Sequence, residues 1–374
     1  MKIFHLFANH KFTGPSDPAM VLATAQAAAG AEIRFISSTH PQAENVLDQS
    51  AMARGLRTFH GLRMPKHFHL SSLRSDVRKL RTLIAQEKPD FIHSHLDGDH
   101  LVGALARTQD GPLLIRSTYD LDPPRGLRAT WIARHTDLWI APTQQAAERL
   151  ASSKNRSREK IRIIPPLLDL ERFKPTSHTE PSKPPASTMK DKIVIGVVAR
   201  MQKHRRFPDL IDSFVAAARI DPRLHLEILG RGSHQDELAR NPARDSGFGD
   251  RIHFPGYIEP SSYPLHLAGF DMVVFLVPGS DGTCRAAREA MACGVPVIAS
   301  RRGLLPELIP TTGGYLLEDE QHETLTQAIL TLAGDENLRR NLADGAKKYS
   351  REAFDVKLHV RTLLDDLDHS LASI

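Results

Sequence analysis

The sequence predicts an α/β protein built from two doubly wound parallel sheets, and three observations lead to this prediction. The chain has 374 residues, and because domains usually hold about 100–200 residues, two domains are expected. Short apolar runs alternate with helical patterns in both halves, which is typical of parallel βαβ units. Residues 174–191 are rich in Pro, Ser and Thr and predict a linker between the halves.

In the first half we expect a strand wherever a short apolar run is bounded by turn residues. Helical patterns lie between these runs and include residues 15–29, which end at Gly30, residues 73–86 and residues 101–108. Together the elements define an N-terminal Rossmann-like domain over residues 1–173. Its predicted strands are residues 2–8, 32–37, 91–93, 113–116, 138–141 and 161–164.

The second half repeats the alternation after the linker and predicts a C-terminal Rossmann-like domain over residues 192–349. The tail, residues 350–374, holds one long helical pattern over residues 350–371. In open α/β sheets the ligand lies beyond the carboxyl ends of the strands, so we expect the site in an interdomain cleft. The predicted strands are residues 192–199, 224–229, 252–254, 272–275 and 295–299.

Composition limits the compartment and the partners. The formal net charge of +5 suits an anionic partner such as a nucleotide, a phosphate or a membrane surface. Two cysteines in a chain of this size do not make a disulfide framework, so a reducing compartment is favoured. The N-terminus resembles a first buried strand and not a signal peptide, and no run approaches the ~20 apolar residues of a membrane span. Any membrane contact is therefore expected to be peripheral.

Residues 275–298 carry the strongest functional pattern. A predicted strand runs into a loop that contains Gly282, and a helix is predicted from about Thr283 to Gly294. Such a loop presents free backbone N–H groups at a helix N-terminus, which suits an anionic or hydroxyl-rich ligand. Asp281 and Glu289 are eight positions apart, about two helical turns, so both carboxylates can face one ligand.

This segment resembles the retaining glycosyltransferases of family 4, which have the GT-B fold of two Rossmann-like domains. Their motif is Glu, seven residues and Glu, followed by Ala-Met-Ala-Cys-Gly-x-Pro-Val-Ile, and residues 289–298 match it closely. The resemblance implies that Glu289 binds the ribose of the donor and that Asp281, one methylene shorter than the usual Glu, contacts the donor sugar. An alternative is that Asp281 only caps the helix. The donor-side loop residues implied with them are Gly282, Thr283 and Cys284.

A basic run follows the predicted strand 192–199. By the resemblance, Arg200 and Arg205 bind the donor diphosphate, and Arg205 stands where the family has Lys. A leaving diphosphate develops negative charge that fixed cations stabilise, and a guanidinium group binds phosphate oxygens in pairs. The alternative is a solvated basic loop.

Two glycine turns resemble further parts of the donor site. Gly230 and Arg231 follow the strand 224–229 and correspond to the family's turn near the nucleotide. Gly256 and Tyr257 follow the strand 252–254 and correspond to the segment whose backbone reads the base. The resemblance is good over residues 192–349 and looser over the N-terminal half.

Residues 93–100, His-Ser-His-Leu-Asp-Gly-Asp-His, allow two interpretations. They nearly match the His-x-His-x-Asp-His zinc motif of metallo-β-lactamase-type hydrolases, but the last His comes two residues late. The glycosyltransferase interpretation instead assigns His95, with His93 as second choice, to the donor sugar. A third interpretation is a hydrogen-bonded strand-end His. We expect no metal site.

The loop after the first strand and a basic helix are the candidates for acceptor contacts. Gly14-Pro15 stands where many family members have Gly-Gly, and proline restricts the backbone, so His10 and Lys11 are the expected contacts there. The predicted helix 73–86 carries Arg74, Arg78, Lys79 and Arg81. This basic face is either solvated or docks on an anionic membrane that holds a lipid-linked acceptor.

The resemblance therefore implies a retaining, metal-independent glycosyltransferase with a UDP- or GDP-type sugar donor and no cofactor or nucleic-acid partner. A glycan or lipid-linked acceptor in cell-surface polysaccharide or lipopolysaccharide synthesis is expected, in the cytoplasm or on the inner face of the membrane. It also implies that the tail, residues 350–374, crosses back to pack on the N-terminal domain. Two alternatives remain open, a non-catalytic GT-B subunit that binds a nucleotide sugar and a sugar-phosphate phosphorylase or epimerase.

Overall fold

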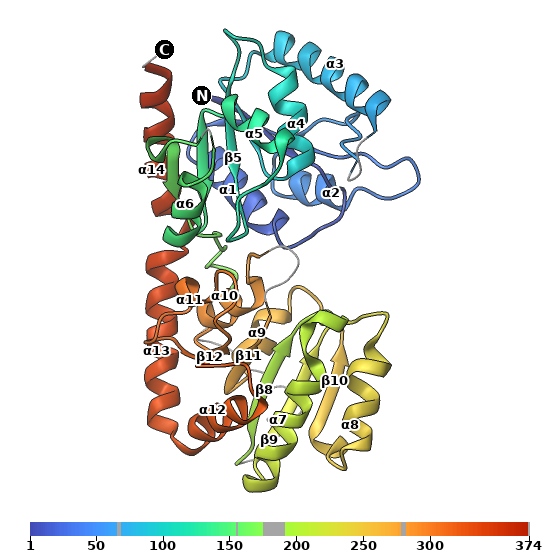
Figure 1. The fold of residues 1–374 in the computed structure, drawn as a ribbon, viewed down its shortest axis with the longest axis vertical. Coiled ribbons are helices and arrows are strands. Elements are labelled where there is room, and N and C mark those ends of the chain that lie inside the picture. The colour runs from blue at the N-terminus through green and yellow to red at the C-terminus, as the bar shows by residue number, and fades with distance from the viewer. Residues whose placement is uncertain (66–68, 155, 175–190, 278–281, 373–374) are drawn as a thin grey trace. The chain divides into compact units, whose positions relative to one another are not determined.

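The computed structural model describes residues 1–65, 69–154, 156–174, 191–277 and 282–372, and its chain forms two compact units (Figure 1). The N-terminal unit consists mainly of Met1–Leu168 and Asp355–Ile374, and the C-terminal unit mainly of Asp169–Ser280 and Cys284–Phe354. Each unit holds one sheet covered by helices. The α/β fold class with two doubly wound parallel sheets is therefore confirmed.

The sheet of the N-terminal unit has seven strands in the order β3-β2-β1-β4-β5-β6-β7, and every strand pairing given for it is parallel. The order reverses between β1 and β4, which is the switch point where such sheets bind ligands. There His5 and His93 are directly paired in register. The strands are β1 (Lys2–Phe7), β2 (Glu32–Ser37), β3 (Arg57–Thr58), β4 (Phe91–Ser94), β5 (Leu113–Ser117), β6 (Leu138–Ala141) and β7 (Ile161–Ile163).

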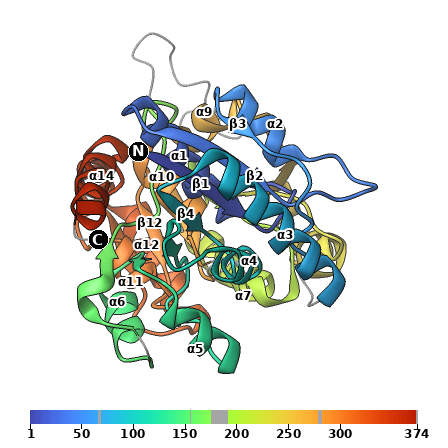
Figure 2. The same ribbon diagram turned by 90° about the horizontal axis from the view of Figure 1, so that it is seen from above.

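Helices cover both faces of this sheet (Figure 2). Successive residues of β1 point to opposite faces, so Ile3 and Phe7 are buried with α1 and α14, whereas Phe4 and Leu6 are buried with α3, α4 and α5. His5 therefore points to the α1 side. The helices are α1 (Ser16–Ala28), α2 (Val46–Ala53), α3 (Leu70–Glu87), α4 (Asp97–Ala106), α5 (Leu127–Arg134), α6 (Gln144–Ala151) and α14 (Val356–Ala372).

The C-terminal unit has a six-stranded parallel sheet in the order β10-β9-β8-β11-β12-β13. The strands are β8 (Ile193–Val198), β9 (Leu224–Leu229), β10 (Ile252–Gly256), β11 (Met272–Phe275), β12 (Val297–Ala299) and β13 (Gly314–Leu316). The helices are α7 (Phe207–Ile220), α8 (Asn241–Asp245), α9 (Tyr263–Ala268), α10 (Arg285–Ala292), α11 (Leu305–Leu308), α12 (His322–Gly334) and α13 (Glu336–Ala353).

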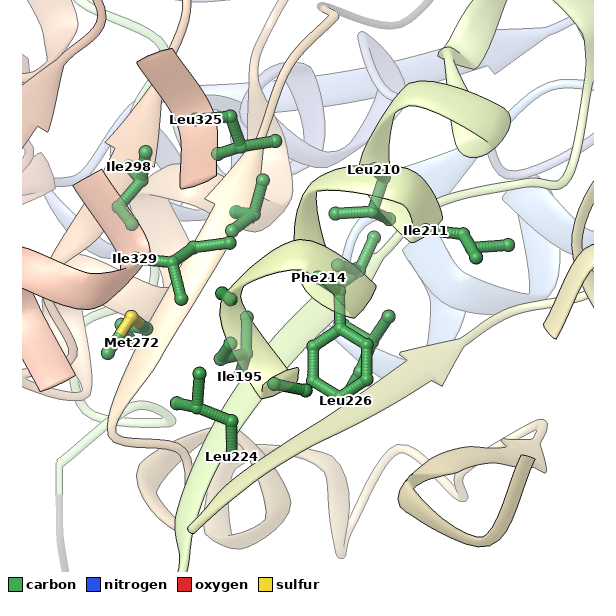
Figure 3. Close-up of a cluster of buried hydrophobic side chains, with 14 of the residues drawn as sticks. Ile195, Leu210, Ile211, Phe214, Leu224, Leu226, Met272, Ile298, Leu325 and Ile329 are labelled. Atoms are coloured by element: carbon green, nitrogen blue, oxygen red, sulfur yellow. The ribbon is translucent and has the colours of Figure 1, made fainter. Parts of the chain in front are cut away.

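The core of the C-terminal unit is formed where α7 and α12 pack on the sheet (Figure 3). Phe214 of α7 and Ile329 of α12 are fully buried there beside Ile195 of β8. Gly196 is the next residue of β8, and a Cβ atom at this position would lie 2.1 Å from Cδ2 of Phe270. A glycine is therefore required at this mid-strand position so that the Phe270 ring can approach the backbone.

The C-terminal tail differs from its prediction as one helix over residues 350–371, which was wrong. Helix α13 ends at Ala353 and α14 begins at Val356. Phe354 follows α13 and is fully buried, with its ring 5.6 Å from the Tyr349 ring of the same unit. The Asp355 carboxylate accepts the backbone N–H of Lys357 at the start of the new helix. The helical pattern runs through this break because the cause is tertiary. Helix α14 packs on α1, with Val360, Leu363 and Leu367 buried.

Of the predicted linker, residues 175–190 lie outside the described residues. Among the described residues no helix is both long and apolar enough to cross a bilayer.

Candidate functional site

In the C-terminal unit, the loops that follow three neighbouring strands of one sheet meet. Arg200 follows β8, Gly230 follows β9 and Gly256 ends β10, and these strands are adjacent. Backbone hydrogen bonds join the loops, from the Gly230 N–H to the Gly256 carbonyl (3.1 Å) and from the Met201 N–H to the Arg231 carbonyl (3.3 Å). The predicted nucleotide and diphosphate residues are thus brought together at the carboxyl edge of this sheet.

Gly230 is required by this close approach. Its φ is +134°, and a Cβ atom there would lie 2.2 Å from the Ala199 carbonyl oxygen. Glycine adopts this conformation without strain. Next to it, the Arg231 guanidinium lies 5.4 Å from the centroid of the Tyr257 ring, which is 57% exposed. An exposed aromatic face therefore stands beside a cation where the sequence predicts the base to lie.

The two predicted diphosphate ligands differ in their surroundings. Arg200 is exposed and has no ion-pair partner among the residues that the structure describes. Arg205 lies in the short 3₁₀ turn Lys203–Arg205 and donates to the Val277 carbonyl (2.7 Å). Its neighbour Arg206 forms ion pairs with Asp209 (2.6 Å) and Glu320 (3.3 Å). Arg200 is therefore more available to an incoming anion than Arg205 or Arg206.

Glu289, the predicted ribose ligand, is fixed within the C-terminal unit from two sides. Its side chain is 2% exposed. Oε1 pairs with the Arg285 guanidinium one helical turn earlier (2.7 Å), and Oε2 accepts the hydroxyl of Tyr263 on α9 (2.9 Å). Burial, followed by the Glu289 charge, raises the pKa of Tyr263 far above its usual value, so this phenol stays a hydrogen-bond donor.

The donor-side loop has an unusual backbone. Cys284 is buried at the N-cap of α10 and has a φ of +49°, in the left-handed region that residues other than glycine rarely adopt. Gly282 has a φ of +66°, and Thr283 is fully buried. Helix α10 begins at Arg285 and not at the predicted Thr283. Asp281 lies outside the described residues, so its predicted sugar contact and its alternative as a helix cap both stay predictions.

In the N-terminal unit, His5, His93 and His95 form a fully buried cluster at the switch point between β1 and β4. His5 Nε2 bonds Gln26 Oε1 of α1 (2.8 Å), and His5 Nδ1 bonds His95 Nε2 (3.0 Å). His95 Nδ1 bonds the Tyr119 hydroxyl (2.7 Å). Because the Gln26 oxygen can only accept, His5 Nε2 must donate to it, and a neutral His5 must then accept at Nδ1. By the same rule, His95 Nε2 donates to His5, and the Tyr119 hydroxyl donates to His95 Nδ1.

His93 lies beside this chain of bonds. Its Nε2 atom bonds the Ser117 hydroxyl (2.8 Å), and its ring stacks on the His95 ring with 4.4 Å between the centroids. The imidazoles of His5 and His95 are neutral in this bonding pattern. Burial lowers the pKa of His5 to about 4 and the pKa values of His93 and His95 well below the usual range. Both ring nitrogens of His95 are thus in use, and a sugar hydroxyl at His95 would have to replace His5 or Tyr119.

A buried ion pair supports the strand end that carries His95. Asp99 of α4 accepts the backbone N–H groups of Ala8 (2.8 Å), His95 (2.9 Å) and Leu96 (2.9 Å). Arg116 of β5 lies 3.7 Å from the same carboxylate. Burial raises the pKa of Asp99 to about 7 although these partners oppose the shift. Asp99 therefore fixes the backbone on both sides of the switch point.

The zinc interpretation of residues 93–100 requires Asp97 and His100 to join the histidines, and they do not. Asp97 accepts from Arg116 (2.8 Å), and His100 Nε2 bonds the Thr136 hydroxyl (2.9 Å). The group with metal-ligand spacing among the described residues is instead His5, His93 and His95, with one ring nitrogen of each within 4.8 Å of the others.

The predicted acceptor loop follows β1. The His10 ring lies 5.1 Å from the His40 ring, and Lys11 is exposed. Gly14 lies in the turn that precedes α1. These residues and the histidine cluster belong to the same unit.

Sequence reasoning missed the residues that hold the predicted ones in place. His5 and Tyr119 bond the ring of His95, Gln26 bonds His5, and Tyr263 bonds Glu289. Arg285 could have been found, because a Glu four residues after an Arg on a helix predicts an ion pair. The other partners come from distant strands and helices, and no local spacing indicates them.

Comparison with known proteins identifies two family matches. Residues 179–349 match the family described as glycosyl transferases group 1, and residues 19–172 match glycosyltransferase family 4. The D-inositol 3-phosphate glycosyltransferase of Saccharomonospora viridis is 26% identical over 328 residues, which cover 79% of this chain and 74% of that protein.

A further relative is the GDP-mannose-dependent alpha-(1-6)-phosphatidylinositol monomannoside mannosyltransferase of Mycolicibacterium smegmatis, 26% identical over 63% of this chain and 64% of its own. Among solved structures, HepE of Anabaena in complex with UDP superposes with a TM-score of 0.80 and 19% identity over the whole of both chains. The similarity to HepE shows that the fold is shared.

Proposed function

The chain belongs to the family 4 glycosyltransferases of the GT-B fold, and on this premise we propose how it uses a nucleotide-sugar donor. The donor is a UDP- or GDP-sugar, and the acceptor is a glycan or a lipid-linked sugar. UDP is bound in the similar HepE structure, and the mycobacterial relative is GDP-mannose-dependent. We infer transfer with retention, without a metal, in the synthesis of a cell-surface polysaccharide or lipopolysaccharide.

One observation carries the proposal. The loops after β8, β9 and β10 meet at one sheet edge and bring an exposed Arg200 next to the glycine turn at Gly230 and the aromatic face of Tyr257. A cation for the diphosphate, a glycine turn without a side chain beside it and a flat surface for the base are the parts that a nucleoside diphosphate requires. Arg205 is proposed as the second diphosphate ligand and Glu289 as the ribose ligand.

The proposed reaction needs no general base from the protein. The acceptor hydroxyl attacks the anomeric carbon on the face from which the diphosphate leaves, and the departing phosphate oxygen takes the hydroxyl proton. Arg200 and Arg205 stabilise the charge that develops on the leaving group. Asp281 with residues 282–284, and His95 with His93, are proposed at the donor sugar; His10, Lys11 and Gly14 are proposed at the acceptor.

The proposal is tested by a donor-hydrolysis screen over UDP- and GDP-sugars, which measures release of free nucleoside diphosphate. Arg200→Ala removes one charge-assisted phosphate contact and is expected to lower turnover at least tenfold. Glu289→Ala is expected to raise the donor KM. The matched control is Arg219→Ala, since Arg219 is an exposed arginine on α7. Equal turnover by wild type and Arg200→Ala would overturn the diphosphate assignment.

We also propose that the exposed basic face of α3, formed by Arg74, Arg78, Lys79 and Arg81, contacts an anionic membrane surface. The opposite side of α3 is buried through Leu80 and Leu83, and all four cations are exposed. Lys79 also donates to the Gly61 carbonyl (2.8 Å) and Arg81 to the Leu105 carbonyl (2.8 Å). Co-sedimentation with vesicles tests this proposal. Equal binding to neutral and anionic vesicles would end it.

A further inference from the structure

A pocket of the N-terminal unit lies apart from the histidine cluster and is lined by arginines. It opens between the start of α4, the loop before α5 and α5 itself. Arg125, Arg128 and Arg156 form its wall together with Asp97 and Trp139. The pocket is therefore strongly basic.

Arg156 is the unusual member of this wall. It is 7% exposed, and its guanidinium carbon lies 4.9 Å from the centroid of the Trp139 ring. One of its nitrogens donates to the Pro124 carbonyl (3.0 Å), whereas its buried Nε has no hydrogen-bond partner. No carboxylate among the described residues lies within ion-pair distance of it. A buried cation without a counter-ion is costly, so the fold maintains a charge that only an added anion would balance.

The nearby carboxylates do not supply this balance. Asp97 in the wall is already paired with Arg116 (2.8 Å). Outside the pocket, Asp122 pairs with Arg149 (2.7 Å) and lies 3.5 Å from Arg125. Arg128 is exposed, and the described residues give it no ion pair. The wall thus keeps an excess of positive charge, which concentrates anions in a cavity with apolar sides.

The histidine in the wall reports the same field. His100 bonds Thr136, and burial followed by the charges of Arg116 and Arg156 lowers its pKa well below the usual range. Arg156 itself has a pKa lowered by burial and by Arg116. Burial is the larger cause of both pKa shifts, and the neighbouring arginine charges act in the same direction.

We propose that this pocket binds a phosphate group through Arg128 and Arg156, with Arg125 at the mouth. Two planar guanidinium groups present paired N–H donors that match the oxygens of a phosphate ester. The inference rests on the N-terminal unit alone and does not depend on the proposed donor site. The phosphate belongs either to a free phosphate ester or to a lipid headgroup. Leu127 and Trp131 on the same helix are 92% and 38% exposed, as expected of side chains that meet a membrane surface.

Phosphate binding is tested with the full chain by thermal shift and calorimetry, using inorganic phosphate and a hexose phosphate against chloride at equal ionic strength. The phosphates are expected to raise the Tm saturably. Arg128→Ala is expected to weaken the apparent affinity about tenfold, because one charge-assisted contact is lost. Arg134→Ala is the control, since Arg134 is exposed on the same helix and does not line the pocket. Arg156→Lys, which keeps the charge and loses the paired donors, is expected to weaken binding as well.

A second experiment distinguishes a free phosphate ester from a lipid headgroup as the source of the phosphate. Vesicles of phosphatidylcholine with a fifth of phosphatidic acid are compared with phosphatidylcholine alone, for wild type, Arg128→Glu and Arg134→Glu, since Arg134 is exposed on the same helix and lies outside the pocket. Binding of the soluble esters identifies a free ester as the ligand. Binding of the acidic vesicles alone, lost in Arg128→Glu and retained in Arg134→Glu, identifies a headgroup. If phosphate acts no differently from chloride and Arg128→Glu leaves vesicle binding unchanged, the proposal is wrong.

Discussion

The histidine cluster of the N-terminal unit and Glu289 of the C-terminal unit are both buried polar sites, but they are held in opposite ways. Glu289 is a charged group with a charged partner one helical turn away, Arg285, and a phenol from the neighbouring helix. His5, His93 and His95 are neutral groups whose partners come from β1, β4, β5 and α1. One site is electrostatic and mostly local, whereas the other is a directed chain of neutral hydrogen bonds.

The two sites should respond differently to substitution. Glu289 is held by two separate partners, Arg285 and Tyr263, so the loss of one leaves the other in place. In the histidine cluster each hydrogen bond has a fixed donor and a fixed acceptor. Substitution of one residue therefore leaves a buried donor or acceptor of the next residue without a partner. We therefore expect substitutions in the histidine cluster to lower mainly the stability of the protein, and substitutions at Glu289 to weaken mainly the binding of the donor.

The largest expected effect is that of His5→Ala on stability. The variant leaves His95 Nε2–H and Gln26 Oε1 without partners and opens a cavity beside Phe35. The free energy of unfolding should fall by roughly 3–5 kcal/mol, measured by urea denaturation. His40→Ala, which alters an exposed histidine of the same unit, should cost far less. Equal losses in the two variants would show that the chain of bonds contributes little.

A second prediction concerns pH. His5, with a folded pKa of about 4 against 6.5, stays neutral in the folded state and takes up a proton on unfolding, so its contribution to stability is lost as the pH falls from about 6.5 to 4. His93 and His95 act in the same direction. Asp99, with a raised pKa of about 7, acts oppositely, because its contribution is lost as the pH rises from about 4 to 7.

The histidines outnumber Asp99, so wild type should become less stable between pH 6.5 and pH 5. His5→Ala should reduce this loss by about 2 kcal/mol, since one group contributes about 1.4 kcal/mol per pH unit. Urea denaturation at pH 7, 6 and 5 measures the slope. The same slope in wild type and variant would mean that folding does not lower the pKa of His5.

These sites also show what the sequence could predict. The strands at residues 32–37, 138–141, 224–229 and 272–275 were predicted with their observed bounds, because apolar runs bounded by turn residues are a local pattern. The break between α13 and α14 was missed, because Phe354 ends a helix only by being buried elsewhere in the fold. In the same way, His95 was predicted from its strand end, whereas its partner His5 is separated from it by 90 residues.

The smallest expected effect tests whether Tyr263 positions Glu289 for the donor. Tyr263→Phe keeps the ring and removes the hydroxyl that bonds Glu289 Oε2 (2.9 Å). Because one hydrogen bond is lost and Arg285 still holds Oε1, the free energy of unfolding should fall by about 1 kcal/mol. If Glu289 binds the ribose in donor and transition state alike, the variant should raise the donor KM a few-fold and leave kcat unchanged.

Tyr349→Phe is the matched control, because the Tyr349 hydroxyl donates to the Glu307 carbonyl at the same distance, 2.9 Å, elsewhere in the same unit. It removes an equivalent bond and should cost similar stability without a change in KM. If KM rose in both variants, the increase would result from the lower stability of the C-terminal unit and not from the loss of the bond to Glu289. A lower kcat at constant KM in Tyr263→Phe alone would mean that the Tyr263 hydroxyl acts on the transition state and not on the placement of Glu289, because uniform binding cannot alter kcat.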